Sequence, residues 1–439
     1  MGSFDELSQV FWQWLVDNKV ALSDGIAFKD YRNEHAGRGV VATRNIEEGE
    51  MLFTLPRSAL FSTMTAALVK KDGMADVLEG LTGWSPLILC MMYELDRPDS
   101  QWKPYFDVLP RTFSTPMFWP DLTALKGTGV LDKIGKEEAD QCYDDQILPI
   151  LKAHPDLFDL QVHTKDLFHI CGSLIMSYSF HDEYKDEQAS QQNDDASDEE
   201  EEEEEDEGLL AMVPMADMLN HKTGFNNARL FHEPEGLVMK AIKAIATGEQ
   251  VYNTYGDLCN ADLLRKYGFT DDNNPFDLCE IDGRDIVALA TPEDQDETVK
   301  EEKLNYLMDE GVMDDCFVID GDHEIPPEMI ASVIVFASPV ETFKKWEQKG
   351  KVPSPKLTLA VQEILLKILE GRLKKYDCSL QDDLDRGMTF KDENEKNAFR
   401  IRLGEKKILE TTITKLRQDM PTKRSSSPLA GSVEKKQRK

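Results

Sequence analysis

The chain has 439 residues, of which 41% are hydrophobic and 30% are charged, a composition typical of a soluble globular protein. Its net charge of −33 argues against direct binding to nucleic-acid backbones, and no apolar run is long enough to span a membrane. The seven cysteines are scattered without a CxxC pair, so we expect neither a metal site nor a disulfide framework.

Residues 4–20 predict an amphipathic helix, because apolar side chains from Phe4 to Leu15 recur at helical spacing. Residues 25–60 predict strands joined by glycine-bearing turns, in the order of a β-meander. Residues 61–180 are largely helical in character and include an apolar, Pro- and Trp-rich loop. The first 180 residues therefore indicate a mixed α and β domain.

An acidic run covers residues 182–207, with sixteen acids and one lysine. Such a low-complexity segment cannot pack against itself, so we expect a disordered, solvated loop. Its usual meaning is a linker, and docking of basic proteins is the alternative. The run carries −15 of the net charge of −33, so the remainder of the chain is acidic as well.

Strands resume after residue 208 and alternate through LVMKAIKAIATGEQVYNTYG, with a turn at Thr247–Gly248. A short helix, NADLLRKYGF, follows, and DDNNPFD marks a boundary. Long amphipathic helices then dominate residues 278–417 and predict a second domain. The polar, basic stretch 418–439 predicts a disordered tail, and we find no internal repeat.

Three segments carry residues suited to chemistry. Gly37-Arg38-Gly39 forms a turn where a backbone can approach a ligand closely, although most such turns are simple hairpins. Asn220 offers both donors and an acceptor, and His221 beside it has no second ligand at metal spacing. Tyr255 and Tyr267 flank a short helix. Each segment taken singly has a structural explanation that outweighs function.

Their order, GRG, ADMLNH, VYNTYG and YGF, resembles the SET-domain methyltransferases. The segments MVPMADMLNH, SYSF and RLGEKKILE resemble the branch that contains Rubisco large-subunit, ribosomal-protein and nuclear lysine methyltransferases, over about residues 5–417. The resemblance implies an α+β fold: a β-rich SET domain with a pseudoknot and a helical insert, then an all-helical C-terminal substrate-binding domain. Its boundaries would be residues 1–24 for the N-terminal helix, 25–272 for the SET domain with an insert at about 61–210, 278–417 for the helical domain and 418–439 for the tail.

The resemblance also implies roles for single residues. Tyr255 corresponds to the catalytic tyrosine, and Tyr267 to a second tyrosine that lines the lysine channel. The residues implied to bind S-adenosyl-L-methionine are Gly37, Arg38, Gly39, Asn220, His221, Tyr255 and Phe269. The residues implied to meet the substrate are Asp217, Tyr178 and Tyr267, although some relatives have an arginine where Tyr178 stands.

The implied activity is S-adenosylmethionine-dependent protein-lysine N-methylation. A phenol has a pKa of about 10 and is a poor base at neutral pH, so we expect Tyr255 to orient the amine while water takes its proton. The acidic body favours a basic protein substrate, ribosomal or chromatin-associated.

Two basic clusters in the tail resemble a two-part nuclear import signal, which predicts a nuclear protein with the cytoplasm as a second location. A merely solvated tail is the alternative. Two other functions stay open at this point: an inactive SET-fold scaffold, and an acidic interaction protein that binds basic partners. The sequence does not indicate an oligomeric state.

Overall fold

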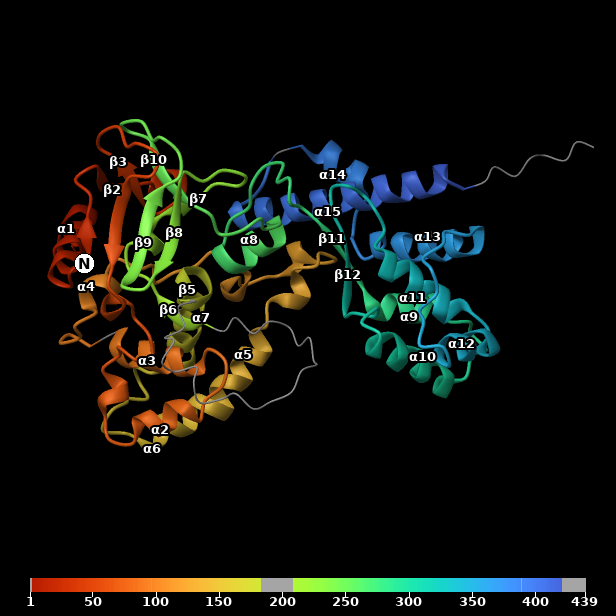
Figure 1. Ribbon diagram of the computed structural model, residues 1–439, viewed down its shortest axis with the longest axis horizontal. Coiled ribbons are helices and arrows are strands. Elements are labelled where there is room, and N and C mark those ends of the chain that lie inside the picture. The colour runs from red at the N-terminus through yellow and green to blue at the C-terminus, as the bar shows by residue number, and fades with distance from the viewer. Residues whose placement is uncertain (1, 96, 183–207, 388, 421–439) are drawn as a thin grey trace, which may run out of the picture. The chain divides into compact units, whose positions relative to one another are not determined.

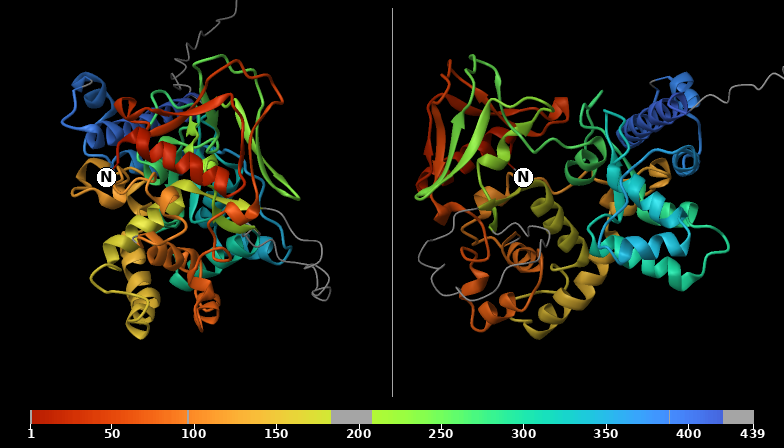
Figure 2. Two further views of the ribbon diagram at one scale, coloured as in Figure 1. Left: turned by 90° about the vertical axis from the view of Figure 1, so that its left-hand side faces the viewer. Right: turned by 45° about the vertical axis from the view of Figure 1, so that its right-hand side comes forward.

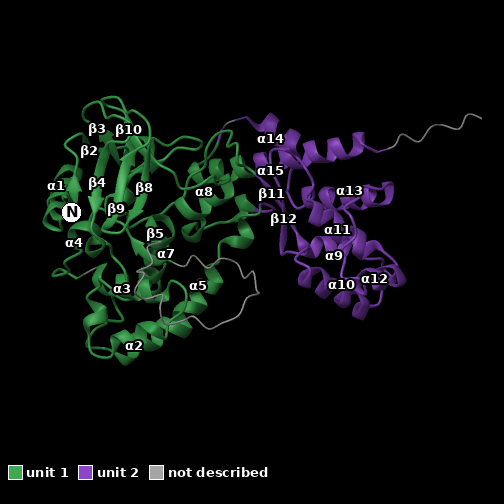
Figure 3. Ribbon diagram, in the orientation of Figure 1, with its two compact units in different colours: residues 1–125, 129–277, 390–401 green, residues 126–128, 278–389, 402–439 purple. Residues whose placement is uncertain are grey.

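The structure is a computed structural model that describes residues 2–95, 97–182, 208–387 and 389–420. The chain divides into two compact units, drawn in green and purple in Figure 3. Unit 1 comprises residues 1–125, 129–277 and 390–401, and unit 2 comprises residues 126–128, 278–389 and 402–439. The predicted acidic loop and most of the predicted basic tail lie outside the described residues.

Unit 1 contains two four-stranded sheets and a hairpin (Figure 1). The first sheet has the order β1 (Ala21–Leu22), β4 (Met51–Leu55), β9 (Gly236–Ala241) and β8 (Ala228–Glu233). The second has the order β2 (Ile26–Asp30), β3 (Arg38–Ala42), β10 (Gln250–Asn253) and β7 (Asn220–His221). The hairpin pairs β5 (Ser179–Asp182) with β6 (Leu209–Met212) and thus brackets the acidic run.

The predicted meander over residues 25–60 is wrong in one respect. β2 and β3 do pair as a hairpin, but β4 leaves them and joins the other sheet. The same change of sheet occurs between β9 and β10. Alternating apolar residues identify a strand, but they do not say which neighbour it pairs with, because both sheets bury one face in a common core.

Two corners with the same hydrogen bonds cause these changes of sheet. Residues 42–50 and 241–249 share the pattern Ala-x-(Arg or Lys)-x-Ile-x-x-Gly-Glu, a repeat that our sequence analysis missed. Each corner turns at a glycine with positive φ, 85° for Gly49 and 87° for Gly248. The amide of each glycine donates to the alanine carbonyl that begins the opposite corner, at 2.8 Å in both cases. The two corners therefore hold each other in place.

The expected N-terminal helix is present as α1 (Phe4–Asp17), and it begins with a capping box at Ser3 and Glu6. The helix lies beside the strands (Figure 2). The rings of Phe11 on its buried face and of Phe28 on β2 stack with centroids 5.6 Å apart. The other helices of unit 1 are α2 (Met74–Glu79), α3 (Ser85–Leu95), α4 (Lys103–Phe106), α5 (Lys136–Cys142), α6 (Leu148–Ala153), α7 (Lys165–Tyr178) and α8 (Asn260–Tyr267).

Unit 2 is helical, as expected, but not entirely so. A two-stranded antiparallel sheet joins β11 (Cys279–Asp282) to β12 (Cys316–Ile319) within its core. The helices are α9 (Gly283–Ala290), α10 (Glu297–Asp309), α11 (Pro327–Ala337), α12 (Val340–Glu347), α13 (Leu359–Leu373) and α14 (Leu380–Arg386), together with the larger part of α15 (Glu393–Gln418). No helix among the described residues has both the length and the apolar character that a bilayer crossing requires.

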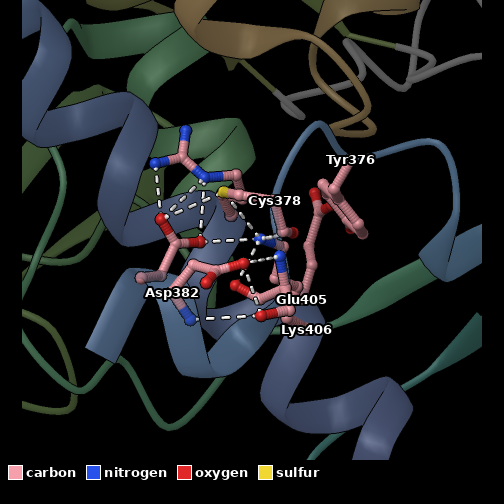
Figure 4. Close-up of polar contacts among 8 residues, drawn as sticks. Tyr376, Cys378, Asp382, Glu405 and Lys406 are labelled. Carbon is pink, nitrogen blue, oxygen red and sulfur yellow. Dashed lines mark hydrogen bonds and ion pairs between the residues drawn. The ribbon is translucent and has the colours of Figure 1, made fainter. Parts of the chain in front are cut away.

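A buried polar cluster joins α14 to α15 in unit 2 (Figure 4). The Lys406 side chain is 1% exposed, and its Nζ lies 2.7 Å from Asp383 Oδ2. Arg402 Nη2 lies 2.9 Å from the other oxygen of the same carboxylate. Burial alone would raise the pKa of Asp383, but the hydrogen bonds and charges of these two cations outweigh it and lower the pKa. Lys406 also donates to the backbone carbonyls of Cys378 and Ser379.

Candidate active site

A strained turn leads into the ADMLNH segment. Met215 is fully buried and has φ 82° and ψ −44°, a backbone conformation that residues other than glycine rarely adopt. The turn opens a short 3-10 helix (Ala216–Met218) that carries Asp217, and β7 follows directly. The strained turn thus directly precedes the segment that carries buried Asp217 and partly buried Asn220 and His221.

β7 pairs in parallel with β10, so that Asn220 lies opposite Tyr252 and His221 opposite Asn253. Asn220 Nδ2 donates to Gln250 Oε1 at 2.7 Å. A methyl group built on Gly39 would meet the same two groups, at 2.8 Å from Asn220 Nδ2 and 2.6 Å from Gln250 Oε1. Glycine is therefore required at position 39, because the side chains of Asn220 and Gln250 and the Tyr31 ring occupy the space beside it.

Three aromatic rings stack at the centre of the site. The His221 and Tyr255 rings have centroids 5.0 Å apart and an interplanar angle of 20°. Tyr267, at the end of α8, also stacks with Tyr255, at 4.4 Å and 23°. Phe269 follows at 6.4 Å from Tyr267 in a tilted arrangement. The structure thus brings together four residues that the sequence analysis had singled out.

The Tyr255 phenol is fixed at its far end, where its hydroxyl donates to the Leu219 carbonyl at 3.1 Å. Burial, and after it the neighbouring groups of Tyr178, Tyr267 and Asp217, raise the pKa of Tyr255 well above its ordinary value of 10. Burial also raises the pKa of both Tyr178 and Tyr267 to about 12. None of these phenols accepts a proton as phenolate at neutral pH.

Asp217 is a buried carboxyl with one unpartnered oxygen. The Tyr105 hydroxyl donates to Oδ2, whereas Oδ1 has no hydrogen-bond partner among the described residues. Burial raises the pKa of Asp217 to about 8, against the opposing effect of the Tyr105 hydrogen bond. Tyr178 is close enough for Asp217 to contribute to the rise in its pKa. The site therefore holds an acid that is largely protonated at neutral pH.

Within the Gly37–Gly39 turn, Gly39 lies against Asn220 and Gln250, whereas Gly37 has open space beside it. Gly37 has φ 62°, and the position of its missing side chain has no atom within 4 Å. The Arg38 side chain points away, because its guanidinium lies 4.1 Å from the Phe4 ring centroid and donates to the Ser8 hydroxyl on α1. Burial lowers the pKa of Arg38 to about 10. The Arg38 side chain thus packs against α1.

These groups fit a ligand that is both polar and cationic. The position of a Gly37 side chain is open space, and the stacked rings of Tyr255 and Tyr267 provide apolar faces. The carboxylates of Asp257 and Asp271, whose charges act on His221, favour positive charge, and the unpartnered Asp217 oxygen can accept a hydrogen bond. Among the described residues, no group of three or more His, Cys, Asp or Glu side chains has the arrangement of a metal site.

Sequence reasoning missed several residues of the site. Gln250, which bonds Asn220, stands inside a segment quoted for its strand pattern, and Thr223, which bonds His221, stands two residues after the ADMLNH segment. Tyr105 lies 112 positions before Asp217 in the apolar loop, where no sequence signal marks it. Asp271 stands in the stretch that was interpreted as a boundary.

The comparisons with known proteins agree with this architecture. Residues 37–256 match the SET domain family, and residues 294–409 match the Rubisco LSMT substrate-binding family. The N-lysine methyltransferase SETD6 of Homo sapiens is 30% identical over 414 residues, which cover 85% of this chain and 83% of the relative. Ribosomal lysine N-methyltransferase 4 of Saccharomyces cerevisiae is 36% identical over 292 residues, which cover 64% of this chain and 59% of the relative.

A solved structure of the SET domain of LSMT, bound to lysine and AdoHcy, has the same fold, with a TM-score of 0.71 at 21% identity over 95% of this chain and 92% of that chain. Fold and site together define a SET-domain enzyme with a helical C-terminal unit. The chain belongs to the SET-domain family of protein-lysine N-methyltransferases, enzymes that use S-adenosylmethionine as the methyl donor.

Proposed function

We propose that this enzyme methylates lysine side chains of a basic ribosomal or nuclear protein, with Tyr255 as the catalytic residue. The observation that carries the proposal is the stack of His221, Tyr255 and Tyr267, whose central phenol is fixed at its hydroxyl by Leu219. Rings on both sides exclude water, and the fixed hydroxyl provides a point that orients an amine.

The residues that hold S-adenosylmethionine in this proposal surround that stack. The Gly37–Gly39 backbone borders the open space beside Gly37, and Asn220 and His221 lie on β7 next to it. Phe269 supplies an apolar face beyond Tyr267. The bound cofactor supplies a methyl group on a positively charged sulfur, which the surrounding acids favour electrostatically.

The substrate lysine meets Asp217, Tyr178 and Tyr267 in this proposal. Asp217 Oδ1 is the buried acceptor that an incoming ammonium group would satisfy. The amine attacks only in its neutral form, whose ordinary pKa is about 10.4, and desolvation beside a cationic group lowers that value. Since the pKa of Tyr255 is raised rather than lowered, the proton leaves to water and Tyr255 orients the amine.

The net charge of −33 supports a basic substrate, because an acidic surface attracts basic proteins over long distances. Incubation of the enzyme with labelled S-adenosylmethionine and ribosomal or nuclear extracts, followed by mass spectrometry, identifies the acceptor. We expect label on lysines of basic proteins. Label on acidic proteins alone would refute the substrate class, and cofactor binding without any transfer would support the inactive scaffold instead.

Nuclear location is the remaining element of the proposal, and it rests on the basic clusters Lys423–Arg424 and Lys435–Lys439 of the tail. Imaging of the full chain and of a chain lacking residues 421–439 tests it. We expect the full chain in the nucleus and the shortened one in the cytoplasm as well. An unchanged distribution would make the tail a solvated extension.

A further inference from the structure

Both ring nitrogens of His221 have partners in the structure. Nδ1 accepts the backbone amide of Tyr255 at 3.1 Å. Nε2 lies 3.3 Å from the Thr223 hydroxyl, and that hydroxyl donates to the Asp271 carboxylate. A hydroxyl has a single proton, so Thr223 can only accept from His221 while it donates to Asp271. Both ends of the ring therefore demand the same tautomer, with the proton on Nε2.

Asp271, at the end of this chain of hydrogen bonds, is fixed by Asn260. The Asp271 amide donates to Asn260 Oδ1 at 2.8 Å, and Asn260 Nδ2 donates back to the Asp271 carbonyl at 3.0 Å. Asn260 is 2% exposed and is the first residue of α8, the helix that ends at Tyr267. Asp271 is thus fixed to the element that supplies the third ring of the stack.

We propose that Thr223 and Asp271 are positioning residues for methyl transfer: they hold His221 in its Nε2–H tautomer, so that Nδ1 fixes the backbone of Tyr255. The proposal rests on the proposed catalytic role of Tyr255. Neither residue acts on the reacting atoms, because the effect passes through the imidazole. Partners that accept a hydrogen bond from one ring nitrogen fix the tautomer of a histidine at metal sites in the same way.

The physical consequence of the wrong tautomer is direct. A proton on Nδ1 would face the Tyr255 amide proton, which would lose its acceptor and be repelled. Tyr255 is otherwise pinned by its hydroxyl on Leu219 and by its ring between His221 and Tyr267. Loss of the backbone contact would shift this ring against fixed neighbours. Small displacements of an orienting group cost large factors in rate, because the reacting atoms must be aligned.

Nuclear magnetic resonance of the full chain labelled with ¹⁵N-histidine reads the tautomer directly and needs no turnover. The chain has eight histidines, and the signal that disappears in His221→Gln identifies the one of interest. We expect the Nε2–H tautomer in the wild type and in Thr223→Ser and Asp271→Asn, which keep the hydroxyl or the acceptor. We expect a mixture of tautomers in Thr223→Val and Asp271→Ala.

Kinetics with poly-L-lysine as the acceptor complete the test. We expect Thr223→Val to lower kcat about tenfold, which corresponds to about 1.4 kcal/mol, with KM for poly-L-lysine and cofactor affinity within about twofold. Thr223→Ser should restore kcat. Thr223 is partly exposed, so equal melting temperatures of the Val and Ser variants serve as the folding control.

The two proposals fail in different ways. A wild-type spectrum with the proton on Nδ1, or a Thr223→Val enzyme with wild-type kcat, would overturn the positioning role. A wild type that transfers no methyl group to lysine, or a Tyr255→Phe enzyme with unchanged turnover, would overturn the proposed function instead.

Discussion

Tyr255 is the residue on which the proposed chemistry depends. It is fixed at three points, namely the amide by His221, the ring between two other rings, and the hydroxyl by Leu219. A raised pKa keeps the hydroxyl protonated, so it is a permanent donor. Its value to the reaction lies in geometry, because a group that is already placed needs no reorganisation in the transition state.

Replacement of Tyr255 by phenylalanine keeps the ring and removes the hydroxyl. We expect kcat to fall at least about a hundredfold, or about 2.7 kcal/mol, because the amine loses its orienting group. Cofactor affinity measured by calorimetry should change little. Tyr306→Phe is the matched control, since Tyr306 is a buried tyrosine that packs in the core of unit 2 and not in the stack. Wild-type turnover in Tyr255→Phe would contradict the assignment.

Asp217→Asn tests the buried acid. Burial raises the pKa of Asp217 to about 8 from 3.8, so between about pH 4 and pH 8 the folded protein keeps a proton that the unfolded chain has lost. Wild-type stability therefore falls as pH rises through this window, whereas asparagine cannot ionise. At pH 8 we expect the free energy of unfolding of Asp217→Asn to exceed that of the wild type by about 1.4 kcal/mol or more. We also expect the substitution to raise KM for the acceptor.

Urea unfolding at pH 5 and pH 8 measures the effect, with exposed Asp309→Asn as the control that should show no such trend. A stability difference that stays constant between the two pH values would show that Asp217 is ionised in the folded protein throughout.

Candidate site residues can be recognised from the sequence where they stand in a motif, as Asn220, His221 and Tyr255 do. The sequence does not predict their partners. Tyr105 reaches Asp217 from 112 positions away, and the acid's abnormal pKa depends on a burial that no spacing reveals. The backbone contact expected of the Gly37–Gly39 turn stays a prediction, and no spacing in the sequence indicates that the Arg38 side chain packs on the Phe4 ring.

At the scale of elements, strand type was predictable and strand pairing was not. The alternation of residues 25–60 and 236–253 is the same in a meander and in two separate sheets. In unit 2, the helical periodicity was correct, while β11 and β12 are each only four residues long, too short for a pattern of period two to stand out.

Gly39→Ala tests the contact of β3 with β7 and β10. Its φ is not in the left-handed region, so the obstacle is the space occupied by Asn220, Gln250 and the buried Tyr31 ring. We expect cofactor affinity to fall about tenfold because Asn220 is displaced, with a loss of stability of about 1–3 kcal/mol. Calorimetry with S-adenosylhomocysteine measures the affinity. Gly80→Ala, which meets only ordinary contacts at 3.6 Å, should leave it unchanged.

Asp383→Ala tests the link between α14 and α15. It leaves the buried Lys406 ammonium without its carboxylate, and we expect a loss of about 3–5 kcal/mol in the unfolding free energy. Glu297→Ala, which removes an exposed ion pair with Lys300 in the same unit, should cost less than about 1 kcal/mol. Urea denaturation compares them. If the two substitutions lowered the free energy of unfolding equally, the ion pairs of the cluster in Figure 4 would be as accessible to water as the exposed pair.

At the scale of the whole molecule, charge governs encounter with the substrate. If an acidic surface steers a basic protein, kcat/KM should fall at least about tenfold between 20 and 300 mM salt, because screening shortens the range of the attraction. Rates with N-acetyl-lysine amide, a small acceptor with a single charge, should change far less. A flat salt profile with a basic protein would rule out steering.

The paired corners have a consequence for synthesis of the chain. Gly49 and Gly248 belong to one hydrogen-bonded unit, yet roughly 200 residues separate them, so the contact order of unit 1 is high. Loop-closure entropy grows only logarithmically, by about 0.6 kcal/mol for each doubling of length, so the helical insert between the corners can lengthen at little thermodynamic cost. On the ribosome, at about 5–20 residues per second, the first corner waits roughly 10–40 s for its counterpart.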